Sequence, residues 1–513
     1  MSIIQKYTPF FVSALLMCIV LYFIYPHYQY YVDPDGTAYL TISQRYANGD
    51  YQKAINGYWS PWSCWLTALL IKTGLAAIPA SVVINAIGAA GFLYISQSLF
   101  LHFGIIRQLQ WLLCVTLAFF LCYAVFWQSF DDPWECFFLL SALRLMLSEE
   151  FNNKPVSWII YGMIGTLAYF AKAYSFPFFI LNTLCCTYFI SKDNKVQWLK
   201  ISAVSIGVMI FCSMPWIWLL HNKYGIWTTS TSGSLNMSWY LVGHPQWKEG
   251  IGLLIPPPYN DSPYYWEDPY FANGATPHFW DSWHLFGLQF IRIGLNIWKF
   301  IVSSFQLSVF FIVVVGYAKW MLFWKRGVAL AKDIQVLMLS FLLFTLGYVL
   351  VNFESRYLWY MLPPGMVIGA LVLQNMNSAK WKNTLYLVFP VTFLFYPAWK
   401  MISMYDEGAI EYNIAQQLKE NGIYGAFASN ARPGADIQRI ERIAYFSGDQ
   451  LYSLTKQNAS QPDLLKEMRR YHINYYFLLQ PSDEASFVDE HGLALPDVTK
   501  GAVAGLKVFL VNP

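Results

Sequence analysis

The sequence "YYVDPDGTAYL" places two carboxylates, Asp33 and Asp35, on either side of Pro34, a few residues after an apolar run that ends near Ile24. A carboxylate held at a membrane surface with a suitable pKa can accept a proton from an incoming hydroxyl or amide, which is general-base chemistry. The pattern also fits a structural role, because "DGTAYLTISQRYANG" predicts a short helix that stops at Gly49 and has Asp35 as its N-cap. The two roles are compatible, since capping fixes a side chain in one place.

A second group of carboxylates, Asp131, Asp132 and Glu135, occurs in "FDDPWE" between two later apolar stretches. The spacing has a complete structural explanation as a helix start. Asp132 would be the N-cap, Pro133 the first helical residue and Glu135 the third, which is close to a capping box. The pattern by itself therefore requires no function for these side chains.

The composition shows in which environment these carboxylates lie. The chain has 513 residues, of which 56% are hydrophobic and 12% are charged, about half the charge of an ordinary soluble domain. Apolar stretches near the roughly 20 residues needed to cross a membrane recur from the N-terminus to about position 400. The sequence therefore predicts a multi-pass membrane protein, and a net charge of +3 gives no reason to expect a nucleic-acid partner.

The apolar stretches predict roughly eleven membrane spans. They lie near 9–25, 80–100, 109–128, 134–148, 157–171, 175–190, 199–220, 295–317, 334–352, 357–375 and 384–400. The first stretch is too long for a signal-peptide core and lacks a small-residue cleavage site, so we expect it to be retained. Lys and Arg gather in alternate short loops, which predicts a cytoplasmic N-terminus, and the odd number of spans then places the C-terminal end outside.

Two basic residues depart from this charge bias. Lys172 and Arg356 fall at the predicted outer ends of spans, where positive charge is otherwise scarce. Lys172 can be explained as a snorkelling side chain near a helix C-terminus, and Arg356 as a local ion pair with Glu354. Charges at membrane depth are costly to keep, however, so both residues are also candidates for function.

Three polar segments are predicted on the extracytoplasmic side, two of them loops of the membrane domain of residues 1–400 and the third a tail that follows it. The first, residues 26–79, carries Asp33 and Asp35, and the second, residues 221–294, is crowded with Trp, Tyr and Pro. The third is a soluble tail, residues 401–513, in which "EYNIAQQLKENG" and "PDLLKEMRRYHI" predict helices and "YGAFAS", "YYFLL" and "LKVFLV" predict strands. We expect a small α/β domain. It has no Gly-rich phosphate loop and no nucleophile elbow, so no chemistry is assigned to it.

The first polar segment resembles the first outer loop of the GT-C glycosyltransferases of the protein O-mannosyltransferase-like group, which includes the lipid A aminoarabinose transferase. The shared pattern is an acidic residue after span one, a Tyr on a short helix, a Gly-Asp pair, a Pro-aromatic run and an amphipathic helix. The matching residues are Asp35, Tyr39, Gly49, Asp50, Pro61 and Trp62. Many members follow the aspartate with a second acidic residue, whereas this chain has Gly36.

Two later sequences extend the resemblance over roughly positions 9–370. "GTLAYFAKAYSFPF" is similar to the Lys-bearing end of a span in this family, and "NFESRYLWYMLPP" is similar to the Arg-Tyr start of a late span. The resemblance implies a polytopic helical fold and the inverting transfer of a sugar from a polyprenyl-phosphate donor in the membrane. It implies that Asp35 is the general base, assisted by Asp33, and that Lys172 and Arg356 bind the donor phosphate.

The resemblance also suggests further site residues and partners. Asp131, Asp132, Glu135 and Tyr39 are candidates for orienting the acceptor or a metal ion. The resemblance points to no definite cofactor and leaves a divalent cation open. The expected location is the bacterial inner membrane, with the active site outside the cytoplasm and a glycan, lipid or protein as acceptor.

Two other classes of protein fit part of the pattern. A transporter or flippase for lipid-linked sugars would also be polytopic, but such proteins usually show repeats and broken spans near the midplane, and this chain concentrates its charge at one face. A non-catalytic envelope-assembly protein of the same fold is the other class. The sequence indicates neither which sugar is moved nor which acceptor receives it.

Overall fold

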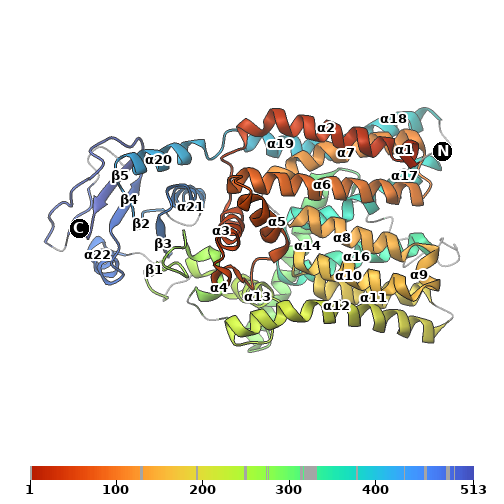
Figure 1. Ribbon diagram of the computed structural model, residues 1–513, viewed down its shortest axis with the longest axis horizontal. Helices are drawn as coiled ribbons and strands as arrows, with labels where there is room; N and C mark the ends of the chain where they lie inside the picture. The colour runs from red at the N-terminus through yellow and green to blue at the C-terminus, as the bar shows by residue number, and fades with distance from the viewer. Residues whose placement is uncertain are drawn as a thin grey trace.

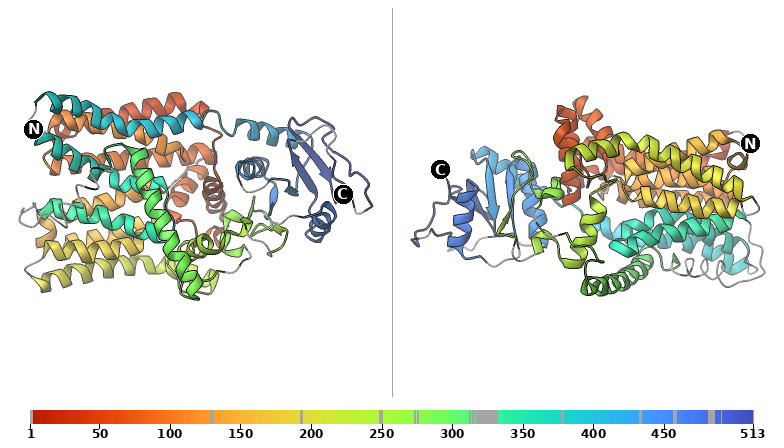
Figure 2. Two further views of the ribbon diagram at one scale, coloured as in Figure 1. Left: turned by 180° about the vertical axis from the view of Figure 1, so that it is seen from behind. Right: turned by 90° about the horizontal axis from the view of Figure 1, so that it is seen from below.

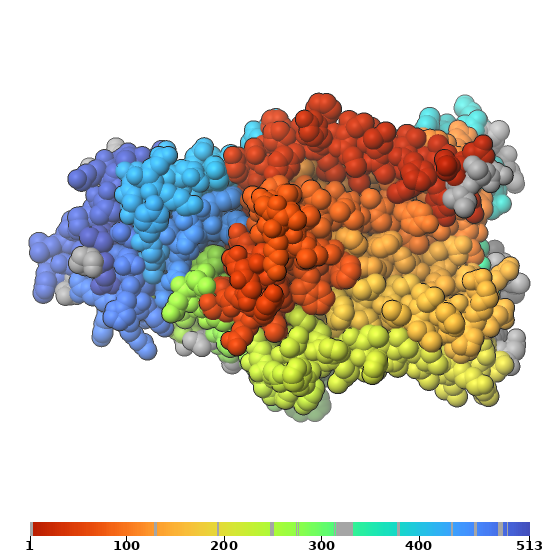
Figure 3. Space-filling model, viewed as in Figure 1, coloured from red at the N-terminus to blue at the C-terminus, as the bar shows by residue number. Residues whose placement is uncertain are grey.

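The computed structural model describes residues 3–127, 131–191, 194–247, 251–272, 274, 276–311, 313, 316, 332–376, 379–431, 434–455, 459–480, 486–489 and 491–512. Over these ranges the chain forms a bundle of apolar helices with a small α/β domain at one end (Figure 1; Figure 2). The N-terminus lies at the opposite end of the bundle (Figure 1). In the space-filling view the first polar segment, in orange, lies between the blue α/β domain and the yellow helices (Figure 3).

The bundle consists of apolar helices at the positions where spans were expected. They are α2 (Thr8–Ile24), α6 (Ala77–His102), α7 (Arg107–Phe126), α8 (Asp132–Met146), α10 (Pro155–Ala171), α11 (Ser175–Ile190), α12 (Lys195–Tyr224), α14 (Trp283–Leu307), α16 (Lys332–Val351), η5 (Ser355–Met361) with α17 (Leu362–Gln374), and α18 (Ala379–Val391) with η6 (Thr392–Leu394) and α19 (Phe395–Ser403). Eight helical stretches of the described chain are long and apolar enough to cross a membrane, and α10 and α11 are shorter apolar helices. Part of the expected span 295–317 lies outside the described residues. The polytopic helical fold is confirmed.

The first of these helices, α2, shows how the bundle divides its surface. Its buried side chains, Pro9, Ser13, Met17 and Leu21, recur at every fourth residue and so form one stripe. The other faces are also apolar although they are exposed, as at Leu15, which is 62% exposed. A helix on the surface of a soluble protein would carry polar residues there, so these faces suit contact with lipid.

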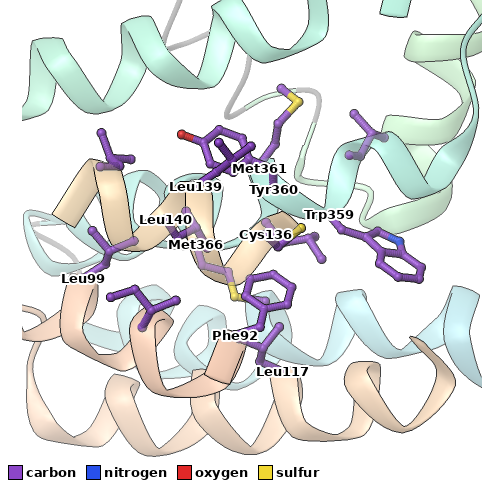
Figure 4. Packing of buried hydrophobic residues seen from close by; sticks show 14 of the residues in the cluster. Phe92, Leu99, Leu117, Cys136, Leu139, Leu140, Trp359, Tyr360, Met361 and Met366 are labelled. Carbon is purple, nitrogen blue, oxygen red and sulfur yellow. The ribbon is translucent and has the colours of Figure 1, made fainter. Parts of the chain in front are cut away.

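The core of the bundle lies where α6, α7, α8 and the η5–α17 stretch meet. Phe92 of α6, Leu117 of α7 and Leu140 of α8 are fully buried there together with Trp359 (Figure 4). Trp359 comes three residues after Arg356, so its burial in the core fixes the start of this span. The position of Arg356 at the end of the bundle is therefore set by apolar packing.

The first polar segment folds into short helices that cover one end of the bundle. They are α3 (Pro34–Asn48), α4 (Tyr51–Ala54) and α5 (Pro61–Lys72), after the single turn η1 (Tyr25–His27). Gly49 ends α3 in the left-handed conformation, with φ +82°, and its amide donates to the carbonyls of Arg45 and Tyr46, as the sequence predicted. Ala38, Ile42 and Tyr46 form the buried face that packs on α5.

The C-terminal domain is built on a five-stranded sheet with the strand order β1-β3-β2-β4-β5. Its elements along the tail are α20 (Ala409–Glu420), β2 (Ala426–Ser429), α21 (Ala435–Ser447), β3 (Gln450–Leu454), α22 (Gln461–Arg470), β4 (Tyr475–Leu479) and β5 (Leu506–Leu510). β2 is parallel to β3 and β4, whereas β5 is antiparallel to β4. The sequence predicted α20, α22, β2, β4 and β5, but it did not predict α21 or β3.

One strand of this sheet comes from the second polar segment. β1 (Leu254–Ile255) pairs antiparallel with β3, with Leu254 opposite Leu454. The rest of the segment contains α13 (Ser232–Val242) and the single turns η2 (Pro245–Trp247), η3 (Tyr265–Glu267) and η4 (Pro269–Phe271). The tail sheet therefore holds the second polar segment by backbone hydrogen bonds, a link between distant segments that no local sequence pattern indicates.

The second polar segment is shorter than the expected range 221–294. Helix α12 continues to Tyr224, and α14 already begins at Trp283. The start of α14 is fixed by Ser282, whose hydroxyl accepts a hydrogen bond from the Leu285 amide at 3.2 Å. Ser is a common N-cap residue. It lies before the apolar stretch 295–317 that predicted the span, so the helix begins earlier than expected.

The junction between α19 and the α/β domain is joined to the turn after α2. The Asp406 amide donates to the His27 carbonyl at 3.0 Å, and the His27 and Asp406 side chains also lie 3.0 Å apart. Two residues later, Gly408 has φ +89°, and a Cβ placed there would lie 2.0 Å from the Tyr30 carbonyl oxygen. Only Gly fits this close approach without a shift of the backbone.

We expect Gly408→Ala to destabilise the protein more than Gly422→Ala. Both residues have positive φ, which costs an L-residue roughly 1–2 kcal/mol, but a Cβ on Gly422 (φ +68°) meets nothing within 4 Å. Gly408→Ala must in addition displace the Tyr30 carbonyl. Melting temperatures of the two variants in detergent measure the difference, and equal losses would contradict the close packing at this junction.

Candidate active site

The first turn of α3 separates the roles of the two aspartates. Asp33 is the N-cap, and its carboxylate accepts a hydrogen bond from the Gly36 amide at 2.7 Å. The prediction that Asp35 is the cap was therefore wrong by two residues. Pro34 takes the first helical position, where its fixed φ and missing N–H are tolerated, so the residue before it becomes the cap. The Asp35 carboxylate is not used for capping.

Asp35 is held between two donors from distant parts of the chain. The indole Nε1 of Trp266 donates to Asp35 Oδ1 at 3.1 Å, and Nη2 of Arg356 donates to Asp35 Oδ2 at 3.1 Å. The Asp35 side chain is still 23% exposed. The carboxylate is thus fixed in direction and remains accessible from outside the protein.

The carboxylates at the start of α8 are not used for capping either. The prediction of an Asp132 cap was wrong by one residue, because Asp131 is the N-cap residue and its side chain makes no capping hydrogen bond. Asp131 instead accepts a hydrogen bond from the Ser63 hydroxyl at 2.5 Å, and the Tyr39 hydroxyl bonds to it as well. The helix-start explanation therefore does not account for where these carboxylates point.

Lys172 is the C-cap residue of α10, and its side chain turns back into the bundle. Its ammonium is paired with Asp132 and lies 3.8 Å from Glu135 Oε2, while the other oxygen of Glu135 accepts from the Ser175 hydroxyl at 2.9 Å. The ammonium also lies 4.8 Å from the centre of the Tyr357 ring. A snorkelling lysine would extend into water, so this explanation does not fit the position of Lys172.

Arg356 connects these groups. Its Nε lies 2.9 Å from Glu354, which is the local pair that the sequence suggested, and 3.9 Å from Asp132 Oδ2. With the bond to Asp35, the guanidinium thus reaches carboxylates from three elements, and it is 17% exposed. The local pair with Glu354 is therefore one part of a larger arrangement.

Five of the residues singled out in the sequence form one charge cluster. It consists of Asp35, Asp132, Glu135, Lys172 and Arg356, which come from α3, α8, the end of α10 and η5. The contacts above run without interruption from Asp35 through Arg356 and Asp132 to Lys172. Asp131 and Tyr39 lie beside this cluster, and Asp33 stands two residues before Asp35.

The electrostatics of the α3 start follow from burial. Burial and, to a smaller extent, the negative charge of Asp35 raise the pKa of the Asp33 carboxyl to about 7, against the opposing effect of the Gly36 hydrogen bond. Asp33 and Asp35 thus differ in their contacts although they are two residues apart: Asp33 is a half-buried cap, and Asp35 is accessible and paired with Arg356.

A second ion network, which the sequence analysis missed, brings Trp266 to Asp35. The buried guanidinium of Arg45 in α3 is paired with the buried carboxylate of Glu267, next to Trp266, and also lies 3.0 Å from Asp261. The side chains of Arg45 and Glu267 are 7% and 2% exposed. They are 222 positions apart in the chain, so no local spacing could have indicated the pair.

The other side of the same turn is anchored to α12. Asp268 accepts hydrogen bonds from the Tyr224 hydroxyl at 2.8 Å and pairs with Lys223 at 2.9 Å. The side-chain amide of Asn56 donates to the Glu267 carbonyl at 2.7 Å. The turn that carries Trp266 is therefore held by the first polar segment and by the bundle at once.

The carboxylates of the charge cluster have cationic side chains of the chain as partners. In the described ranges, no three His, Cys, Asp or Glu side chains are grouped so that they could hold a metal ion. Lys172 and Arg356 lie between the carboxylates, where a cation would have to bind. The positive charges of this cluster are thus supplied by the chain itself.

No family model and no curated protein sequence matches the chain. Solved structures are similar to it. ArnT from Cupriavidus metallidurans bound to undecaprenyl phosphate has a TM-score of 0.58 at 11% identity, over 100% of this chain and 99% of that one. ArnT in the apo state has a TM-score of 0.53 at 11% identity, over 98% of both chains. The oligosaccharyltransferase of Archaeoglobus fulgidus, in complex with Zn and sulfate, has a TM-score of 0.53 at 11% identity, over 92% of this chain and 68% of that one.

These neighbours are GT-C glycosyltransferases, and the match to ArnT extends over the whole length of both chains. The chain has a GT-C fold. The resemblance seen in the first polar segment is thus confirmed at the level of the fold. In this GT-C bundle α3, which carries Asp35, lies at the end that faces the α/β domain (Figure 1).

We expect Asp33→Asn to reduce the pH dependence of stability. Asn keeps the cap, because its side-chain oxygen can also accept from the Gly36 amide. With a pKa raised from 3.8 to about 7, the folded wild-type protein binds a proton that the unfolded chain releases. The stability contributed by protonated Asp33 is therefore present at low pH and lost as the pH rises through about 7.

The melting temperature in detergent, measured between about pH 5 and about pH 8, checks this expectation. It should fall with rising pH in the wild type and fall less in Asp33→Asn. Asp436→Asn, which removes an exposed carboxylate of α21, should behave as the wild type. Parallel curves for all three proteins would show that Asp33 does not titrate in this range.

Proposed function

We propose that this protein is a membrane glycosyltransferase that moves a sugar from a polyprenyl-phosphate donor to an acceptor, with inversion at the anomeric carbon. The observation that supports this most is the joining of a base and two cations in one cluster. Asp35 lies 3.1 Å from Arg356, and Arg356 lies 3.9 Å from Asp132, which is paired with Lys172. The donor class is supported by the fold shared with ArnT, whose crystal structure contains undecaprenyl phosphate.

In the proposed reaction the acceptor O–H or N–H gives its proton to the Asp35 carboxylate. The freed electron pair of the acceptor attacks the anomeric carbon and forms the new glycosidic bond. The bond between that carbon and the phosphate oxygen breaks, and its electron pair stays on the departing polyprenyl phosphate. Lys172 and Arg356 stabilise the negative charge that develops there.

The pairing of Arg356 with Asp35 gives this scheme a simple order of events. A donor phosphate offers the Arg356 guanidinium a stronger, bidentate partner than the single contact that Asp35 makes. When Arg356 turns to the phosphate, Asp35 Oδ2 loses its donor and is free to accept the proton of the acceptor. Trp266 still holds its other oxygen, so the carboxylate keeps its direction.

The remaining polar residues have supporting roles in this proposal. Asp132 and Glu135 hold the Lys172 ammonium where the phosphate is expected. Asp131 and Tyr39 are placed beside them to orient the acceptor, and Asp33 sets the start of α3. The active-site end of the bundle is proposed to face away from the cytoplasm, in the bacterial inner membrane, because basic residues gather in the opposite loops.

We expect Lys172→Ala to weaken binding of undecaprenyl phosphate about tenfold or more, the size expected for a lost charge-assisted hydrogen bond. Lys154→Ala is the matched control, because Lys154 is the N-cap residue of the same helix α10, at its other end. Binding can be measured by native mass spectrometry of the purified protein in detergent. Equal affinities for the two variants would contradict the phosphate site.

We expect Asp35→Asn to retain undecaprenyl phosphate binding and to lose transfer by about 10²–10⁴-fold, the usual contribution of a general base. Lipid extracts of cells that carry Asp35→Asn should accumulate an isoprenoid-linked sugar that wild-type cells consume, as seen by mass spectrometry. The purified wild type should consume that lipid in detergent, where a transporter has no compartments to act between. Wild-type turnover by Asp35→Asn would reject the assignment.

A further inference from the structure

The α/β domain touches the chain directly next to the two aspartates. Helix α21 packs against α3 (Figure 1), and the Nε of Arg442 in α21 donates to the Val32 carbonyl at 2.5 Å. Val32 is fully buried and immediately precedes Asp33, the cap of α3. Arg442 of the α/β domain thus binds the backbone of the turn that precedes Asp35. The sequence had assigned no chemistry to this domain.

The Arg442 side chain is held firmly itself. It is 4% exposed, and its Nη2 lies 2.5 Å from Glu407, in the junction between α19 and α20. Its guanidinium lies 5.5 Å from the centre of the Tyr31 ring. A buried guanidinium with a carboxylate and a carbonyl as partners has little freedom, so the Val32 carbonyl is bound in a defined position.

A second hydrogen bond reaches the other side of Asp33. The Tyr264 hydroxyl donates to the Pro34 carbonyl at 2.6 Å, and Tyr264 is 1% exposed. Its segment is fixed to the sheet of the α/β domain, because the Leu451 amide of β3 donates to the Pro263 carbonyl at 2.7 Å. The carbonyls before and after Asp33 are therefore both bound by groups that the α/β domain holds.

Apolar contacts support the same docking. Val32 and Leu40 of the first polar segment pack with Tyr445 and Phe446 of α21. Beside Arg442, burial raises the pKa of Glu441 well above its usual value, and the charge of Asp35 contributes to this shift. Helix α21 is thus within electrostatic range of the charge cluster.

We propose that the α/β domain acts as a positioning part of the active site: through Arg442 and Tyr264 it binds the carbonyls of Val32 and Pro34 and thereby sets the direction of Asp35. The two are positioning residues, since these hydrogen bonds go to backbone carbonyls of the turn and not to the charge cluster. The effect of this contact on catalysis rests on the proposed function, whereas the contact itself is independent of it. Docking of the domain and activity of the site are then coupled.

The contact can be tested by hydrogen–deuterium exchange of the backbone amides at the start of α3, in the full-length protein in detergent. Arg442→Gln should raise the exchange rate there about tenfold. Arg439→Gln is the matched control, because Arg439 lies on the same helix and is paired with Glu411 of α20 at 2.7 Å. Equal exchange in the two variants would overturn the proposal.

Tyr264→Phe provides a second variant in case Arg442→Gln impairs folding. It removes a single hydroxyl and keeps the ring, so the domain should remain docked while exchange at the start of α3 increases. Tyr265→Phe is its control, because the Tyr265 hydroxyl faces His244 at 3.4 Å instead of α3. Unchanged exchange in Tyr264→Phe would remove this residue from the proposal.

The same variants separate positioning from donor binding. Arg442→Gln and Tyr264→Phe should bind undecaprenyl phosphate as the wild type does and consume the accumulated lipid-linked sugar about tenfold more slowly. Faster exchange with unchanged consumption would overturn the positioning role. A wild type that consumes no such lipid would reject the proposed function and the catalytic meaning of the contact, while the exchange rates would still decide whether the contact holds α3.

Discussion

Charge at the end of an apolar helix bundle must be paired, because an isolated buried ion costs several kcal/mol even after the protein relaxes around it. In this protein carboxylates and cations alternate from Asp35 through Arg356 and Asp132 to Lys172. Each arrives on a different element, so the arrangement exists only when these elements pack as they do. Pairing lowers the free-energy cost of burying these charges. It also lets the cluster respond to a bound anion, since an anion that binds one cation leaves a carboxylate with fewer partners.

The three polar segments depend on one another in the same way. Arg45 and Glu267 join the first segment to the second, and β1 joins the second to the sheet of the third. The third segment returns through Arg442 to the turn before α3. Each of these links buries polar groups that need partners, so removing one segment would leave unpaired groups on another. They are best regarded as one unit that covers the end of the bundle.

Some expectations were wrong for a simple local reason. Both "DPDG" and "DDPW" contain a Pro in the first turn of a helix. Helix α3 begins at its Pro, with Asp33 as the cap, whereas α8 begins at Asp132, one residue before its Pro, with Asp131 at the N-cap position. A shift of one or two residues decides which carboxylate serves the helix and which is left for other contacts. Asp33 is used as a cap, whereas Asp35 and the carboxylates at the start of α8 make other contacts, and these contacts support the proposal that they serve the reaction.

The sequence by itself determined the polytopic fold, the order of its parts, the place of Asp35 in the first polar segment and the positions of Lys172 and Arg356 at ends of spans. Hydrophobic length and the rarity of charge near the membrane are local properties that can be read along the chain. Tertiary structure alone decided that these charges meet, that Trp266 and Arg45 take part, and that α21 reaches the site. Those contacts join residues as much as 410 positions apart, and pairing over such distances follows from packing of the whole chain and leaves no periodic pattern in the sequence.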